Sequence, residues 1–180
     1  DVAIEHAQKL FDKYRNEENI LPGLGLDMAA ALLAIDKPNQ GREVLKDLAE
    51  RFAEDTLLLG KIDAMADQPI SVKAKENASN INAEGKLLFD AGSYNEAVAH
   101  FRVAINAYPN NVELKLNLLL AMMQCINASS ADYAESAEMV DEAAALMASL
   151  ESLPSVHKAY KRYQSLALEM QQLQDIQDVA

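Results

Sequence analysis

The chain has 180 residues, half of them apolar and only 6% aromatic, and its 28 acidic and 16 basic residues give a formal net charge of −12. This balance argues against nucleic acid and anionic membranes as direct partners, because both are bound through basic clusters. The single cysteine, Cys125, excludes an internal disulfide, and no apolar run reaches the ~20 residues that a membrane-spanning helix needs.

The apolar residues recur with a period near 3.6 along almost the whole chain, which predicts helices and no sheet. Short turns rich in Pro, Gly and Asn separate these helices, and the Pro22-Gly23 turn is expected to precede the second one. The expected helices cover about 4–14, 24–35, 44–52, 57–66, 72–90, 94–107, 112–126, 132–151 and 155–177. Short turns of this kind favour antiparallel neighbours, and therefore a stack of helical hairpins.

One internal segment carries a repeat-like pattern of small and large residues within a window of ~34 residues. Its positions are Ile81, Gly85, Leu88, Ala97, Phe101, Ala104 and Pro109. This pattern resembles the tetratricopeptide repeat, with Glu84 as the one clear departure, since Leu is usual there. The small residues Gly85 and Ala97 are expected where two helices cross closely.

The flanking sequence resembles the same repeat more weakly. The resemblance implies an all-α fold: a single tetratricopeptide-like domain over 1–180, built as a solenoid of antiparallel helical hairpins. Within it, we expect degraded repeats over 1–68, the clearest repeats over 72–151 and a C-terminal capping helix over 155–177. Polar residues on the last helix, such as Lys158 and Gln171, suit a cap, because a solenoid needs a polar outer face at its end.

A narrower resemblance covers most of the chain. The extra helix over 57–68 is followed by Gln68-Pro69-Ile70-Ser71 and then by Asn82-Ala83-Glu84-Gly85-Lys86-Leu87-Leu88-Phe89. This order is similar to the tetratricopeptide effector region of bacterial two-component response regulators. The resemblance implies a cytoplasmic signalling protein of a phosphorelay. The chain itself lacks the strand–helix pattern of a receiver domain, and it opens on Asp1 without an initiator Met, so we expect a fragment.

The sequence offers no catalytic constellation. His6, His100 and His157 lie far apart, and none has a partner at metal-ligand spacing. The segment Gly23-Leu24-Gly25 lacks the preceding strand of a phosphate-binding loop and is interpreted as a turn. We therefore expect no enzyme, with no catalytic, cofactor-binding or metal-binding residues.

In tetratricopeptide-repeat domains the inner helix of each repeat lines a concave groove that holds a protein or peptide. The register implies the groove residues Asn82, Lys86, Phe89, Asp90, Glu113, Leu116, Asn117, Leu120 and Gln124. Members that clamp a peptide carboxylate use a Lys and an Asn on the first inner helix and an Asn on the second. Asn117 matches the last position, whereas Asn82 and Lys86 have exchanged identities. Phe89 and Leu120 either anchor a partner or pack into neighbouring helices.

The charges leave further alternatives open. No basic residue lies between Lys115 and Lys158, and six acidic residues in that stretch make the helix over 132–151 acidic. This helix either carries a solvated face with some pairing to neighbouring helices, or docks a basic partner. The rival to a peptide-binding module is a structural domain that forms a homo-oligomer and uses no groove.

Overall fold

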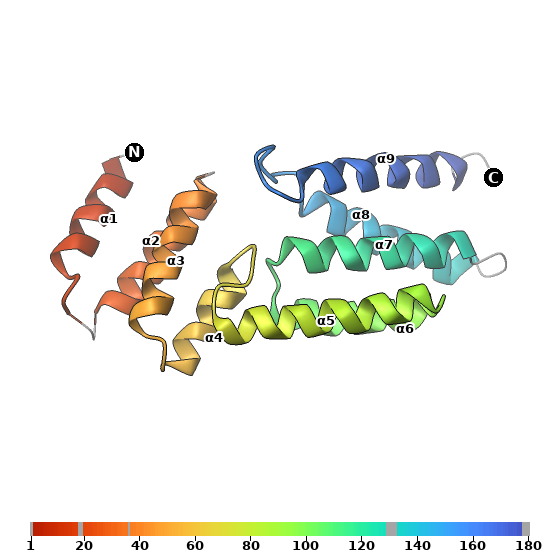
Figure 1. The fold of residues 1–180 in the computed structure, drawn as a ribbon. Coiled ribbons are helices and arrows are strands. Elements are labelled where there is room, and N and C mark those ends of the chain that lie inside the picture. The colour runs from red at the N-terminus through yellow and green to blue at the C-terminus, as the bar shows by residue number, and fades with distance from the viewer. Residues whose placement is uncertain (1, 18–19, 36, 129–132, 178–180) are drawn as a thin grey trace. The chain divides into compact units, whose positions relative to one another are not determined.

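The computed structural model describes residues 2–17, 20–35, 37–128 and 133–177, and all regular structure in these ranges is helical (Figure 1). The expected all-α class is thus confirmed for the described residues. The helices are α1 (Val2–Lys13), α2 (Leu21–Ala34), α3 (Pro38–Arg51), α4 (Thr56–Met65), α5 (Val72–Asp90), α6 (Tyr94–Ala107), α7 (Val112–Ala128), α8 (Tyr133–Ala148) and α9 (Tyr160–Gln177).

The chain divides into two compact units, unit 1 (Asp1–Ala78) and unit 2 (Ser79–Ala180). The boundary falls within α5, whose first residues belong to unit 1 and whose remainder belongs to unit 2. The expected grouping of 1–180 into one domain stays a prediction. Each unit has its own core of buried apolar side chains and is described separately.

In unit 1, α2 packs against α1, α3 and α4. The closest approach is between α2 and α3, because a Cβ added at Gly25 would lie 2.6 Å from the Leu48 side chain. Apolar residues from all four helices and from the segment after α4 fill the core around this crossing. They are Phe11, Leu21, Met28, Ala29, Leu32, Leu45, Leu48, Leu58, Ile62, Ala66 and Ile70.

The connection between α4 and α5 is held by buried hydrogen bonds. The carboxylate of Asp63 accepts bonds from the backbone N–H groups of Ile70 and Ser71, both at 3.0 Å, and from the Ser71 hydroxyl. The Ser71 hydroxyl oxygen accepts in turn from the N–H of Ala74 at 3.0 Å, as a residue capping a helix start does. Asp63 and Ser71 therefore fix where α5 begins.

In unit 2, α7 is the central helix and packs against α6, α8 and α9. The C-terminal part of α5 and α6 form an antiparallel pair joined at Gly92, whose φ of +75° suits a glycine that ends a helix. Apolar side chains of α7 are buried along its whole length, as expected for a helix covered on several sides. They are Val112, Leu114, Leu116, Leu118, Leu119, Ala121, Met122, Met123, Cys125 and Ile126.

Three expected helix starts are wrong. The helix expected from about residue 44 begins at Pro38, which stands in its first turn. Pro22 and Gly23 do not form a turn, and Gly23-Leu24-Gly25 is not a loop; all lie in α2, which begins at Leu21. Proline is favoured in the first turn of a helix, where its missing N–H has no helical partner. The last helix begins at Tyr160 instead of residue 155, because the His157 Nδ1 atom accepts the Ala159 N–H at 3.0 Å and the preceding residues form turns.

The helix expected over 132–151 is observed from Tyr133 to Ala148, and residue 132 lies outside the described residues. Beyond Ala148 the chain changes to tighter turns, in which the N–H groups of Leu150 and Glu151 donate to carbonyls three residues earlier. Such bonds satisfy carbonyl groups at a helix end.

Candidate protein-binding groove

Three polar side chains from three helices of unit 2 are joined by hydrogen bonds. Asn117 of α7 donates from Nδ2 to the Oδ1 atom of Asn82 on α5 at 2.7 Å. Arg162 of α9 donates from Nη2 to the Oδ1 atom of Asn117 at 2.6 Å. Because Asn117 bonds on both sides, its amide has one orientation, and the three helices present one continuous polar line.

A hollow of about 390 Å³ lies beside this line and defines the inner groove. Its lining residues are Asn82, Gly85, Lys86, Phe89, Asp90, Phe101, Asn117, Leu120 and Arg162. Apolar and aromatic side chains thus form part of the lining, while amides and charged groups supply the rest. An apolar surface with a few convergent polar groups is typical of a binding site.

Gly85 lines the hollow where α5 and α6 lie close together. A Cβ added there would lie 2.2 Å from the Phe101 ring, so the backbone of α5 approaches α6 as closely as a glycine permits. Ala97 of α6 is fully buried, and the remaining seam is filled by half-buried Ile81 and Leu88. The expected close crossing at Gly85 is therefore present in the structure.

Phe89 and Leu120 are each half-buried, and each contacts the core of unit 2 as well as the groove. The Phe89 ring lies edge-on to Tyr94, with ring centroids 5.2 Å apart. This packing restricts the Phe89 rotamer while part of the ring stays accessible. A held aromatic side chain loses little entropy when a partner covers it.

The basic groups of the groove differ in their surroundings. Lys86 forms an exposed ion pair with Asp90, one turn further along α5. Burial lowers the pKa of the Arg162 guanidinium, and the Glu113 carboxylate acts in the opposite direction. An exposed pair such as Lys86–Asp90 contributes only about 0–1 kcal/mol, so a partner carboxylate can replace Asp90 at little cost.

Six of the nine expected groove residues line this one hollow: Asn82, Lys86, Phe89, Asp90, Asn117 and Leu120. Leu116 was wrongly expected to face the groove, because its side chain is 0% exposed in the core around α7. Glu113 forms an ion pair with Lys158 at 2.8 Å, and Gln124 is half-buried; neither is among the described lining residues.

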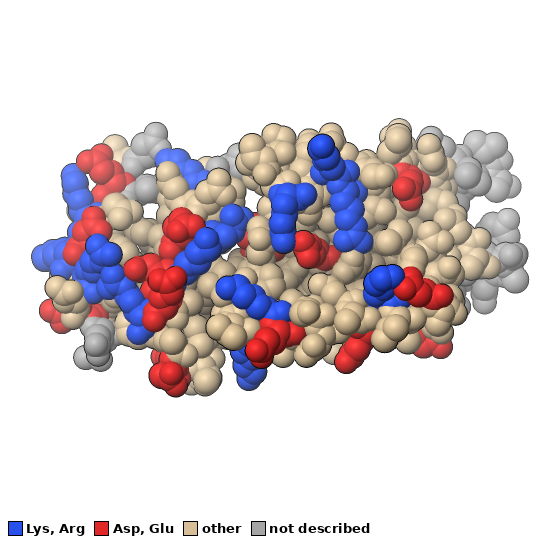
Figure 2. All heavy atoms as spheres, viewed as in Figure 1, with Lys and Arg blue, Asp and Glu red and all other residues tan. Residues whose placement is uncertain are grey.

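Arg162 also lines the groove, although the repeat register did not predict it there. The signal was present, since Lys158, Lys161 and Arg162 form a basic cluster on the last helix. That helix was interpreted only as a cap, and the 45 residues between Asn117 and Arg162 obscured their contact. Figure 2 shows basic side chains over α9 and an adjacent basic and acidic pair over α5 on the same face of unit 2.

The acidic helix α8 pairs with a neighbouring helix. Arg102 of α6 donates from Nε to Glu142 Oε1 at 3.0 Å, and this hydrogen bond raises the pKa of Arg102. Both side chains remain partly exposed. This contact agrees with the interpretation of α8 as a solvated face with some pairing between helices.

His100 and Cys125, whose side chains could in principle be reactive, each contact another residue of unit 2. The Nε2 atom of His100 lies 2.9 Å from the carbonyl oxygen of Ile81, and so joins α6 to α5. Buried Cys125 donates from Sγ to Asn95 Oδ1 at 3.2 Å. Within the described ranges, no group of three or more His, Cys, Asp or Glu side chains is placed to hold a metal ion.

Comparison with known proteins places the chain in no family: it matches no family model, no curated protein and no solved structure. None of the helices in the described residues is both long and apolar enough to cross a membrane.

Proposed function

We propose that the chain is a protein-binding module whose inner groove holds a segment of a partner protein. The observation that carries this proposal is the convergence of Phe89, Leu120, Lys86 and Arg162 on one hollow beside the Asn82–Asn117–Arg162 line. Apolar side chains supply contact area, and the charged and amide groups orient the partner. These are the two components of most protein interfaces.

We further propose that unit 2 belongs to a tetratricopeptide-like solenoid. The support is the Gly85–Phe101 contact within the α5–α6 pair, together with the packing of α7 against α6, α8 and α9. In such a solenoid α5, α7 and α9 are the inner helices. The hydrogen bonds that join Asn82, Asn117 and Arg162 are consistent with this arrangement.

The groove suits an amphipathic segment that carries a carboxylate beside apolar residues. Two cations, Lys86 and Arg162, and one carboxylate, Asp90, line the groove together with its apolar residues, although the chain as a whole has a net charge of −12. A basic segment would meet this pair with like charge, which disfavours binding. An acidic end would meet complementary charge.

The proposal is tested by comparing partner recovery with wild-type bait and with the Lys86→Glu and Asn117→Ala variants. Both variants should recover less partner, Lys86→Glu because the charge is reversed and Asn117→Ala because Asn82 and Arg162 lose their common hydrogen-bond partner. The matched control is Leu87→Ser, at a position 71% exposed that is not among the described lining residues. Equal recovery with all four baits would place the binding surface elsewhere, with α8 as the next candidate.

The alternative function is self-association of the chain, and it must be distinguished from partner binding in the groove. The sizing of wild type and Lys86→Glu at several concentrations distinguishes the two functions. Under the groove proposal, both proteins should elute alike at every concentration. Dilution-dependent elution that Lys86→Glu abolishes would instead assign the groove to contact between copies of the chain.

We also propose that the module is the effector part of a bacterial two-component response regulator in the cytoplasm. This proposal rests on the resemblance over 57–89, where an extra helix precedes the Asn82–Phe89 motif. A receiver encoded in the same reading frame, carrying the phospho-acceptor Asp, would support it. A domain of another kind encoded upstream in that reading frame, in place of a receiver, would overturn it.

A further inference from the structure

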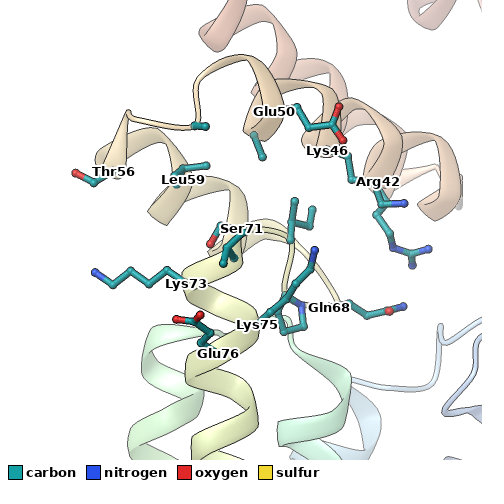
Figure 3. A pocket seen from close by; sticks show the side chains of 15 residues that line it. Arg42, Lys46, Glu50, Thr56, Leu59, Gln68, Ser71, Lys73, Lys75 and Glu76 are labelled. Atoms are coloured by element: carbon teal, nitrogen blue, oxygen red, sulfur yellow. The ribbon is translucent and has the colours of Figure 1, made fainter.

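A second and larger hollow, of about 1040 Å³, lies within unit 1 between α3, α4 and the first residues of α5 (Figure 3). We name it the basic cleft. Part of its surface is apolar and comes from Ala49, Leu59, Pro69 and Ile70. Val72, the first residue of α5, adds an apolar side chain that is 73% exposed. A partner could therefore bury apolar area here.

Four basic residues line this cleft: Arg42, Lys46, Lys73 and Lys75. Among the described residues, only Glu50 and Glu76 are acidic residues that line it, although acidic residues outnumber basic ones in the chain as a whole. Figure 3 shows Lys46 and Glu50 on one side of the open space, and the two α5 lysines on the other. The cleft therefore reverses the charge balance of the chain.

The four cations differ in whether they already have a partner. Arg42 donates from Nε to Asp67 Oδ1 at 3.1 Å and also bonds the second carboxylate oxygen, while Lys46 pairs with Glu43 at 2.8 Å. The side chains of Lys73 and Lys75, by contrast, form no ion pair or hydrogen bond with any residue in the described part of the chain. These two lysines are available to a partner.

The position of the two lysines is unfavourable for α5 itself. They lie among its first four residues, where the partial positive charge of a helix start favours acidic side chains, and the first turn contains none. The helix start is already capped by Ser71. Folding alone does not explain two cations here. Residues that break a local preference without a compensating contact are expected at functional sites.

We infer that the basic cleft is a second docking site, and that its occupant is an acidic amphipathic segment of a partner protein. The carboxylates of the segment would pair with Lys73 and Lys75. Its apolar residues would cover Val72 and the surface formed by Leu59 and Pro69. Charge complementarity sets the chemistry of the occupant, because an acidic segment would supply carboxylates to the side chains of Lys73 and Lys75, which have none in the described part of the chain.

Selection from a random peptide display library on the full 180-residue chain tests this inference. Some selected peptides should combine Asp or Glu with regularly spaced apolar residues. These peptides should bind Lys73→Glu/Lys75→Glu at least about tenfold more weakly than wild type, and the loss should shrink as salt screens the charges. Val72→Ser should weaken the same peptides by removing exposed apolar surface.

Three controls separate this result from a general charge effect, from loss of fold and from the inner groove. Lys61→Glu makes the same kind of charge reversal at one exposed residue of α4 that is not among the described lining of the cleft. It should leave peptide binding unchanged. The Lys73→Glu/Lys75→Glu protein should melt at the wild-type temperature or above it, since its new carboxylates suit the start of α5. Lys86→Glu should not affect cleft peptides, so the inner groove proposal stands or fails separately.

The inference is overturned if no selected peptide depends on Lys73 and Lys75. It is also overturned if the peptides that depend on these lysines carry no acidic residues. Equal weakening by Lys61→Glu would show a general charge effect and would likewise contradict a site in the cleft.

Discussion

Unit 1 and unit 2 both pack one helix against several neighbours and both contain a close glycine contact, but the start of α5 in unit 1 and the α5–α6 pair in unit 2 are fixed by different means. Unit 1 holds the start of α5 with buried polar bonds, in which Asp63 accepts from Ile70 and Ser71. Unit 2 relies on close apolar contact, in which Gly85 admits the ring of Phe101. A buried carboxylate is intolerant of losing its partners, whereas a glycine contact is intolerant of added volume. The two units should therefore respond differently to substitution.

The largest effect is expected from the core of unit 2. Leu119 is fully buried on α7, and Leu119→Ala should lower the free energy of unfolding by about 2–5 kcal/mol through lost burial and a cavity. Denaturant unfolding with hydrogen exchange should show the loss of protection within α7. A loss below about 1 kcal/mol would contradict the central role of α7.

The polar connection of unit 1 is tested by Asp63→Ala. This substitution leaves two buried N–H groups without an acceptor and should cost about 2–4 kcal/mol. Asp55→Ala is the matched control, because the exposed Asp55 carboxylate caps α4 through Leu57 and Leu58 and should cost only about 1 kcal/mol. Similar losses from both variants would show that burial of Asp63 adds nothing.

The close crossing of unit 2 is tested by Gly85→Ala, which should cost about 1–3 kcal/mol because its methyl group meets Phe101. Combining it with Phe101→Leu should give a loss smaller than the sum of the single losses. Gly60→Ala is a control that should stabilise the protein. Nothing lies within 4 Å of its added Cβ, and alanine is favoured over glycine in a helix interior by about 0.5–1 kcal/mol. Stabilisation by Gly85→Ala would contradict the crossing.

The smallest effect is expected at the α6–α8 ion pair. Arg102→Ala removes the contact with Glu142, and the partial exposure of both side chains limits the loss to about 0–1 kcal/mol. The loss should decrease further as salt is added. A salt-independent loss above about 2 kcal/mol would mean that this pair has a larger structural role.

Much of the helical fold could be predicted from the sequence, because local signals carry it. The 3.6-residue period gave the bounds of α5 and α6, and the turn at Pro109 separates α6 from α7. Pro22 misled the prediction, because proline suits both a turn and the first turn of a helix. The start of α9 depends on a hydrogen bond to the His157 ring, which no periodic pattern reveals.

The candidate sites could be predicted only in part. The repeat register found six residues of the inner groove, but it placed Leu116 there, because a period cannot show how many sides of a helix are covered. Arg162 and the basic cleft were missed for a different reason. Their neighbours are distant in the chain, as with the cleft residues Arg42 and Lys75, and only tertiary packing brings them together.

The most direct test of the central claim is photo-crosslinking from inside the inner groove. A photo-reactive phenylalanine analogue in place of Phe89 lies in the groove, and the same analogue in place of Leu87 lies at an exposed position outside its described lining. In cells expressing the chain, we expect a discrete crosslinked partner from position 89. This product should be absent from position 87 and should be lost when Lys86→Glu is added. The same crosslinked product from both positions, or from position 87 alone, would contradict the groove as the binding site.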